Sequence, residues 1–177
     1  MAEKRKNWNG LISGFRASDL VFLDESGCNT DMTRRYAYSL GGSRAVDSAP
    51  LSKPTNTTIL SSIQLDGTLH YTTFSGGTTV EKFKQYLKTD LLPHLNGDSV
   101  LVMDNMKSHH AKAVKNLLDS SGVRYIYLPP YSPDLNPIEK LWSKVKAFLR
   151  KFKARTLDAL PNAIQNAFHA VTVSDCS

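Results

Sequence analysis

Short apolar runs bounded by turn-forming residues alternate along the chain with segments whose apolar residues recur at helical spacing. The run LVFL, residues 20–23, has Ser-Asp before it and Asp-Glu-Ser-Gly after it, which predicts a short buried strand. Residues 36–40 predict a second strand, closed by Gly41 and Gly42. Residues 43–56 contain two prolines and three serines with little periodicity, so we expect a loop there.

The next part of the chain predicts a hairpin followed by a helix. The segments TTILSSIQL and LHYTTF have the composition of strands and are separated by Asp66-Gly67, which is a hairpin signal. From Thr78 onward the apolar residues recur every three to four positions, with Thr79 as the N-cap and Pro93 near the end. The chain therefore changes from strand to helix at this point.

Two further strands and three helices follow. VLVM, residues 100–103, is continuously apolar, as a central strand covered on both faces requires. A helical stripe ends at Ser121-Gly122, and VRYIYL, residues 123–128, predicts a strand stopped by two prolines. Helices are expected over residues 138–152, with Trp142 in the core, and 157–171. Strands followed by helix, strand, helix, strand and then helices predict an α/β fold with helices on a mixed sheet.

Composition narrows the class of protein. A chain of 177 residues with 41% hydrophobic residues suits one domain, and a net charge of +6 suits a partner that carries phosphates. Cys28 and Cys176 lie far apart without metal-site spacing, so neither a disulfide framework nor a zinc site is indicated. No apolar run approaches the roughly 18 residues of a membrane span, and no signal peptide is recognisable. We expect a soluble intracellular protein in a reducing compartment.

Two predicted strands deliver a carboxylate in the same way. LVFL is followed by Asp24 and VLVM by Asp104, and ligands bind at the carboxyl ends of strands in open α/β sheets. If the strands are neighbours, the two like charges repel unless a proton or a divalent cation lies between them. Each aspartate can equally be a turn residue or a helix N-cap. Glu25 is expected to face the opposite side of the sheet from Asp24.

A third acid follows a proline-rich loop in LPPYSPDLNPIEKLW. Asn136 is expected to cap the next helix, Pro137 to occupy its first position, and Glu139 to fall in its first turn. Taken alone, Glu139 can simply complement the helix dipole, which is worth about 0.5 kcal/mol.

The segments LVFLDESG, VLVMDNMKSHH and LPPYSPDLNPIEKLW, in this order, resemble the DDE transposases of the mariner superfamily, including their bacterial insertion-sequence relatives. Asp104 and Glu139 are separated by 34 residues, a spacing typical of that superfamily, and the resemblance covers residues 21–151. It implies a ribonuclease H-like fold, a mixed five-stranded sheet flanked by helices. It also implies a catalytic domain over residues 19–173, after a basic extension or linker at 1–18 and before a tail at 174–177.

The resemblance further implies that Asp24, Asp104 and Glu139 hold two Mg²⁺ ions, with Mn²⁺ as a substitute. The activity would be phosphodiester hydrolysis at transposon ends and transfer of the freed 3′-hydroxyl into target DNA. Expected partners are double-stranded DNA, a second copy of the chain on that DNA, and a separately encoded helix-turn-helix half, in the cytoplasm at a bacterial nucleoid. The alternatives are a ribonuclease H-like nuclease without strand transfer and an inactive DNA-binding remnant.

Other residues are expected to support these roles. Asn105 and His109 match the DNxxxH pattern of the superfamily and would position a metal-bound water or a phosphate, or serve only the local structure. Six cations after Glu139 are candidates for contact with a DNA backbone, or form the solvated face of an amphipathic helix. They are Lys140, Lys144, Lys146, Arg150, Lys151 and Lys153.

Overall fold

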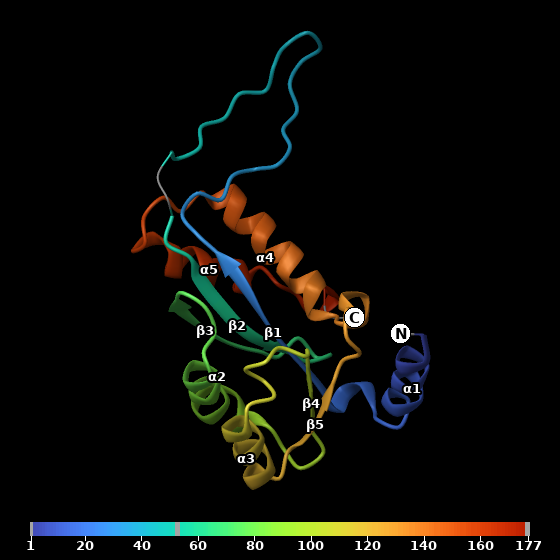
Figure 1. Ribbon diagram of the computed structural model, residues 1–177. Helices are drawn as coiled ribbons and strands as arrows, with labels where there is room; N and C mark the ends of the chain where they lie inside the picture. Colours follow the sequence, from blue (N-terminus) through green and yellow to red (C-terminus); the bar gives the residue numbers. More distant parts are fainter. Residues whose placement is uncertain (1, 52–53, 176–177) are drawn as a thin grey trace.

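Five strands form one mixed sheet in the order β3-β2-β1-β4-β5 in the computed structural model, which describes residues 2–51 and 54–175 (Figure 1). β1 pairs antiparallel with β2, and β2 antiparallel with β3, whereas β4 and β5 run parallel to β1. The strands are β1 Leu20–Cys28, β2 Thr57–Ile63, β3 Leu69–Ser75, β4 Val100–Met103 and β5 Arg124–Tyr127. The five-stranded mixed sheet predicted from the sequence is confirmed.

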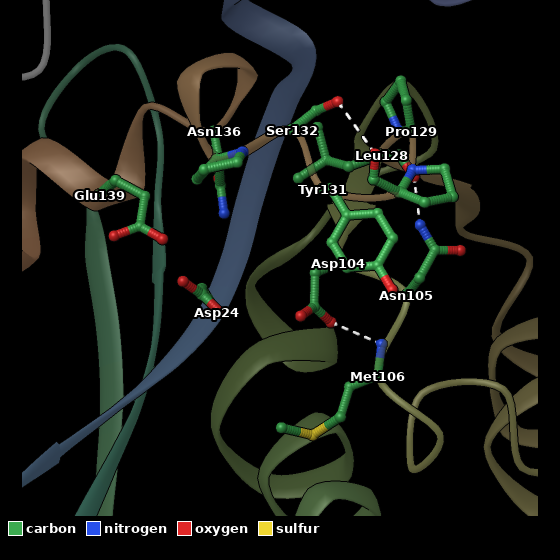
Figure 2. A pocket seen from close by; sticks show the side chains of 12 residues that line it. Asp24, Asp104, Asn105, Met106, Leu128, Pro129, Tyr131, Ser132, Asn136 and Glu139 are labelled. Carbon is green, nitrogen blue, oxygen red and sulfur yellow. Dashed lines mark hydrogen bonds between the residues drawn. The ribbon is translucent and has the colours of Figure 1, made fainter. Parts of the chain in front are cut away.

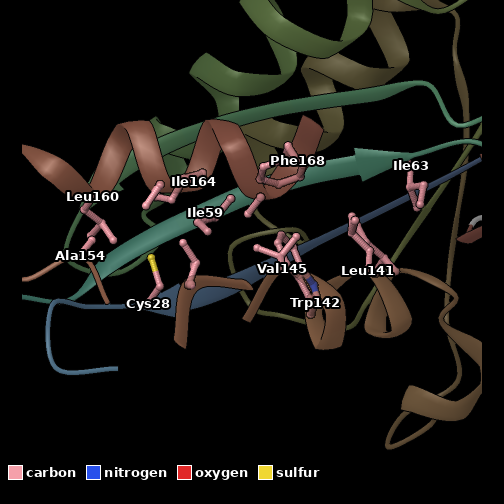
Figure 3. Packing of buried hydrophobic residues seen from close by; sticks show 14 residues of the cluster. Cys28, Ile59, Ile63, Leu141, Trp142, Val145, Ala154, Leu160, Ile164 and Phe168 are labelled. Carbon is pink, nitrogen blue, oxygen red and sulfur yellow. The ribbon is translucent and has the colours of Figure 1, made fainter. Parts of the chain in front are cut away.

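Helices cover both faces of this sheet (Figure 1). On one face α4 and α5 pack on the apolar side chains of β1 and β2, including Ile59 and Ile63, as Figure 3 shows. On the other face α2 and α3 cover Val21, Leu23 and Leu60. The helices are α1 Ala2–Ile12, α2 Val80–Tyr86, α3 Lys112–Ser121, α4 Ile138–Phe152 and α5 Ala159–His169. The four residues of β4 are completely buried, as a strand covered on both faces must be.

Irregular turns extend these helices and connect the strands. α2 continues into a π-helical turn at Leu87–Leu91 and a 3₁₀ turn at Leu92–His94, and further 3₁₀ turns lie at Ala17–Asp19, Pro133–Leu135 and Val173–Asp175. α1 packs through its buried Trp8 on Leu20, Val100 and Leu128, near the start of β1 and β4. No helix in residues 2–51 and 54–175 combines the length and the apolar character that a bilayer crossing requires.

Several local predictions are confirmed by the structure. The Asp66-Gly67 turn joins β2 to β3, with Gly67 at a φ of 87°. The Thr79 hydroxyl accepts a hydrogen bond from the backbone N–H of Lys82 and so caps α2, and Gly122 ends α3 in the left-handed conformation. The last helix, Ala159–His169, is shorter than the predicted 157–171.

The strand predicted at residues 36–40 is wrong. No strand lies between β1 and β2 among the described residues, and the chain from residue 29 to 51 forms a long arm that leaves the body of the molecule (Figure 1). Tyr36 and Tyr38 on this arm are almost fully exposed. The physical reason is that a strand needs a partner, and both edges of β1 are already occupied by β2 and β4.

The first strand is also longer than the sequence suggested. Its parallel pairing with β4 ends at Leu23 opposite Met103, but its antiparallel pairing with β2 continues to Cys28 opposite Thr57. Asp24 therefore lies within β1, at the point where the strand loses its neighbour on one side. Cys28 is buried and free, and Cys176 lies outside the described residues.

Candidate active site

Asp24, Asp104 and Glu139 line one open pocket of about 450 Å³ at the carboxyl ends of β4 and β5 (Figure 2). Figure 2 shows the side chains of Glu139 and Asp24 turned towards each other from α4 and β1. The rest of the wall comes from the turn after β4 and from the proline-rich loop before α4. Those residues are Asn105, Met106, Leu128, Pro129, Pro130, Tyr131, Ser132, Pro133 and Asn136.

Strand register brings the two aspartates together. Leu23 is paired with Met103 in the parallel ladder, so Asp24 and Asp104 are the next residues of two adjacent strands. Asp24 is buried, with 8% of its surface exposed, whereas the Asp104 side chain is 40% exposed. The predicted neighbourhood of these two acids is confirmed, although only β4 ends there.

Burial makes the negative charge of Asp24 costly. Removal from water raises its pKa to about 7, and the nearby charges of Glu25 and Asp104 act in the same direction. The backbone N–H of Glu25 and the indole of Trp142 act against this shift. Trp142 Nε1 donates a hydrogen bond of 3.1 Å to Asp24 Oδ2. A positively charged neighbour would offset the cost of ionising this buried carboxylate.

Asp104 is held by groups on its own side of the pocket. Its Oδ1 accepts a hydrogen bond of 2.9 Å from the backbone N–H of Met106 and lies 2.8 Å from His109 Nδ1. Burial alone would raise the pKa of Asp104, but His109 and the Met106 N–H outweigh it and lower the pKa. Asp104 therefore stays ionised more readily than Asp24.

His109 lies beneath the pocket rather than in its wall. Its ring is completely buried, and Nε2 lies 3.3 Å from Glu25 Oε2. The ring also stacks on Phe83, with 4.2 Å between the ring centroids. Neither ring nitrogen has the alignment of a hydrogen bond, so the contacts with the carboxylates of Asp104 and Glu25 are those of ion pairs. Burial works against a charged imidazole, yet the two carboxylates raise its pKa to about 9. Glu25 does face the side of the sheet opposite Asp24.

Asn105 links the turn after β4 to the end of β5. Its Nδ2 donates to the backbone carbonyl of Leu128, and its Oδ1 lies 3.2 Å from His110 Nε2. The His110 ring stacks on Tyr127 at 4.1 Å. Asn105 thus fixes the proline-rich loop against the strand that carries Asp104.

The proline-rich loop presents Glu139 differently from the prediction. Helix α4 begins at Ile138 after Pro137, and Asn136 makes no side-chain cap; its backbone carbonyl accepts from the Glu139 N–H at 3.1 Å. The Asn136 side chain is buried in the pocket wall instead, with an Oδ1 that has no hydrogen-bond partner among the described residues. Glu139 is exposed in the first turn, and Tyr131 stands at the rim with a φ of 55°.

The six candidate DNA-contact cations have different surroundings. Lys144 is paired with Asp175, and Lys153 with Asp47. Lys153 also ends α4 in a left-handed conformation, so it does not continue a helical row. Lys140 and Lys151 are exposed, whereas Lys146 and Arg150 are half-buried and line a second pocket, described below.

The donor set fits hard divalent cations such as Mg²⁺. All three acids offer oxygen ligands, and Asp24 is a buried carboxylate whose charge a cation would offset. No group of three acidic, histidine or cysteine side chains in the described part of the chain converges tightly enough to hold one ion as it stands. Metal binding would therefore draw the carboxylates together across the pocket.

The family of DDE superfamily endonucleases matches residues 19–161, which is most of the chain and includes all three acids. The chain belongs to the DDE superfamily endonucleases. The family resemblance seen in the sequence is thereby confirmed.

Individual relatives of this DDE chain are transposases. It is 30% identical over 92 residues to the Tc1 transposase of Caenorhabditis elegans, covering 52% of this chain and 34% of that protein. The Mos1 transposase paired-end complex with the left transposon end superposes with a TM-score of 0.82 at 21% identity, over 98% of this chain and 56% of the Mos1 chain. The isolated Mos1 catalytic domain gives 0.74 at 17% identity, over 98% and 83%.

These relatives establish the fold and its extent. The fold is the ribonuclease H-like fold of the Mos1 catalytic domain. The chain spans about a third of the curated relative and about half of the Mos1 chain in its DNA complex.

Two contacts of this DDE site were not predicted. Trp142 was assigned to the core, where it does lie, but its indole also reaches Asp24. The contact between Glu25 and His109 joins residues far apart in the sequence. The available signal was the alternation of β1, which sends Asp24 towards α4 and Glu25 towards α3.

Proposed function

We propose that the chain is the catalytic domain of a DNA transposase that cuts phosphodiester bonds at transposon ends and joins the freed 3′-hydroxyl to target DNA. The observation that carries this proposal is the pocket in which Asp24, Asp104 and Glu139 meet from β1, β4 and α4. Membership of the DDE superfamily endonucleases supports it.

Two Mg²⁺ ions, or Mn²⁺ in their place, would be held by these three acids. Mos1 has been crystallised in paired-end complexes with Mn and with Mg. When bound, a metal pair activates the attacking water or 3′-hydroxyl and stabilises the leaving oxygen. Asp24 and Asp104 would hold the ions from adjacent strands, and Glu139 from the helix. Trp142 would orient Asp24, while His109 would orient Asp104 through its buried ring.

The proposed roles of Asn105 and of the cations along α4 follow from their contacts. Asn105 would set the width of the pocket, since it ties the turn after Asp104 to the carbonyl of Leu128. Cations along α4 would contact the DNA backbone next to the acids, and Lys140, Lys146, Arg150 and Lys151 carry no ion pair among the described residues. Lys144 and Lys153 would have to exchange their aspartate partners for phosphates.

The partners proposed for the whole protein are transposon ends and target DNA, held by a homodimer. Residues 19–173 would be the catalytic domain, 1–18 an extension or linker and 174–177 a tail. Specific recognition of the ends would need a helix-turn-helix half, separately encoded. If the element is a bacterial insertion sequence, the site of action is the cytoplasm, at the nucleoid.

A strand-joining assay tests this function. The purified chain is given a duplex with a pre-cleaved 3′-end, a supercoiled target plasmid and Mn²⁺, with and without an added DNA-binding half. Joined product that is absent in EDTA and in Asp104→Asn is the expected result. Hydrolysis without joining would favour a plain nuclease, and DNA binding without either reaction would favour an inactive remnant.

A further inference from the structure

A second pocket lies along β1 and α4 beyond the acids, and three cations line it. Its volume is about 350 Å³, and its walls include Arg35 from the long arm together with Lys146 and Arg150 from α4. The floor is formed by the end of β1 at Gly27 and Cys28. Asp31 is the only acid in its lining.

The same two elements that carry the acids lead into this pocket. β1 runs from Asp24 to Cys28, a distance of roughly 13 Å at ~3.3 Å per residue. On α4, Lys146 and Arg150 follow Glu139 by seven and eleven residues. At 100° per residue, both lie within about 20° of the line through Glu139, roughly 10 and 16 Å further along the helix. Glu139 and these two cations therefore share one face of α4.

Arg35 is brought to this place by the base of the arm. Arg155, which follows α4, donates hydrogen bonds of 3.1 Å from Nη1 to the backbone carbonyls of Thr30 and Met32. These bonds tie the first residues of the arm to the C-terminal end of α4. Arg35 is only three residues beyond Met32, and it lines the pocket together with the two helix cations although it is exposed.

Positive charge exceeds negative charge in this pocket, because three cations line it together with Asp31. In the part of the chain that the structure describes, no carboxylate forms an ion pair with Arg35, Lys146 or Arg150, whereas Lys144 and Lys153 on the same segment are paired. Partial burial and the nearby positive charge of Arg35 lower the pKa of Arg150. Two guanidinium groups that line one pocket without an ion-paired carboxylate are stabilised by an anion, and a phosphate suits their bidentate geometry.

We propose that the pocket of Arg35, Lys146 and Arg150 binds a backbone phosphate of the DNA strand that is processed at the acids. This inference rests on the proposed function and assigns Arg35 and the base of the arm to substrate binding. The distance along α4 corresponds to a phosphate about three to five nucleotides from the reacting one, at ~3.4 Å per nucleotide in a duplex. The pocket would thereby set the direction in which DNA leaves the active site.

Binding of a fluorescent duplex with a pre-cleaved end, measured by anisotropy in EDTA over a series of salt concentrations, tests this pocket without using the metal site. Arg35→Gln and Arg150→Gln should each weaken binding about fivefold to tenfold and reduce the slope of log affinity against log salt by about 0.9. Arg34→Gln is the matched control, because Arg34 is the exposed neighbour on the arm and does not line the pocket. It should weaken binding less than twofold.

Replacing one phosphate of that duplex at a time by a neutral methylphosphonate locates the contact. Replacement at one position three to five nucleotides from the cleaved end should weaken binding by the wild-type chain but not by Arg35→Gln. Equal losses of binding affinity in Arg34→Gln and Arg35→Gln would contradict phosphate binding in this pocket. The absence of a position-specific effect of methylphosphonate would do the same. Binding is measured in EDTA and does not require the reaction at the acids, so a failure of the proposed function shows in the joining assay and a failure of the pocket shows in binding.

Discussion

The indole Nε1 of Trp142 donates a hydrogen bond of 3.1 Å to the Oδ2 of Asp24. One helix, α4, therefore supplies Glu139 to the pocket and also fixes the carboxylate of the strand opposite it. Trp142 is buried, and its ring packs edge-on against Phe168 of α5. The position of Asp24 thus depends on the packing of both helices on the sheet.

Trp142→Phe should keep most of the packing and remove this hydrogen bond. We expect a loss of about 1 to 2 kcal/mol in the free energy of unfolding and a weaker affinity for Mn²⁺, because the bond favours the ionised form of Asp24. Thermal unfolding with and without Mn²⁺ measures both. Phe168→Leu is the control, since it disturbs the same cluster without touching Asp24; an equal loss of metal affinity there would refute a specific role for the indole.

Divalent metal should stabilise the protein through Asp24. Mg²⁺ should raise the melting temperature of the wild type and raise it much less in Asp24→Asn, since a ligand stabilises the state that binds it. Differential scanning fluorimetry across a Mg²⁺ titration measures this difference. If both proteins gained equally, Asp24 would not be a ligand.

The metal-free protein should lose stability as pH rises. The pKa of Asp24 is about 7 in the folded chain and near its usual value of 3.8 when unfolded, so the folded state binds the extra proton between these values. Stability from this group is complete below about pH 4 and is lost as pH rises through about 7. Urea unfolding in EDTA should show this decline, and Asp24→Asn should flatten it. A wild-type profile that rises from pH 5 to 7 would contradict the assignment.

The pKa of His109 should depend on Glu25. The two flanking carboxylates raise it to about 9, so Glu25→Gln should lower it, and Asp104→Asn should do the same. Titration of the His109 ring signal by NMR in metal-free protein measures the shift. An unchanged His109 in Glu25→Gln would mean that the 3.3 Å contact carries no charge interaction.

Tyr131 should be strained by its backbone conformation. It has a φ of 55°, a left-handed conformation that glycine adopts at less cost than a residue with a Cβ, and the residue is 87% exposed. Tyr131→Gly should therefore be more stable than Tyr131→Ala by about 1 kcal/mol, although glycine ordinarily destabilises relative to alanine. Chemical denaturation of the two variants measures which of them has the larger free energy of unfolding.

The sequence predicted those features of the fold that depend on local pattern. Five of its six predicted strands are present, since a bounded apolar run or a hairpin turn is enough to indicate them, as VLVM and the Asp66-Gly67 hairpin illustrate. Residues 36–40 failed because apolar alternation says nothing about whether an edge is free to pair. The predicted length of β1 was too short for the converse reason, since β2 continues to pair with β1 beyond Leu23.

The candidate site was predictable as a set of acids but not as a set of contacts. Two apolar runs that are each followed by an aspartate place Asp24 and Asp104 side by side once the strands are parallel neighbours. The partners of the acids come from distant segments, as Trp142 and His109 show, and depend on helix packing that no local spacing encodes. The cationic pocket depends in the same way on where the arm folds back, at Thr30 and Met32.

The central claim is that Asp24, Asp104 and Glu139 together hold the catalytic metal ions. Anomalous diffraction from crystals grown with Mn²⁺, recorded for the wild type and for Glu139→Gln, tests it most directly. We predict two anomalous peaks between the three carboxylates in the wild type, and the loss of at least one in Glu139→Gln. Peaks away from this pocket, or the same two peaks in both proteins, would contradict the account.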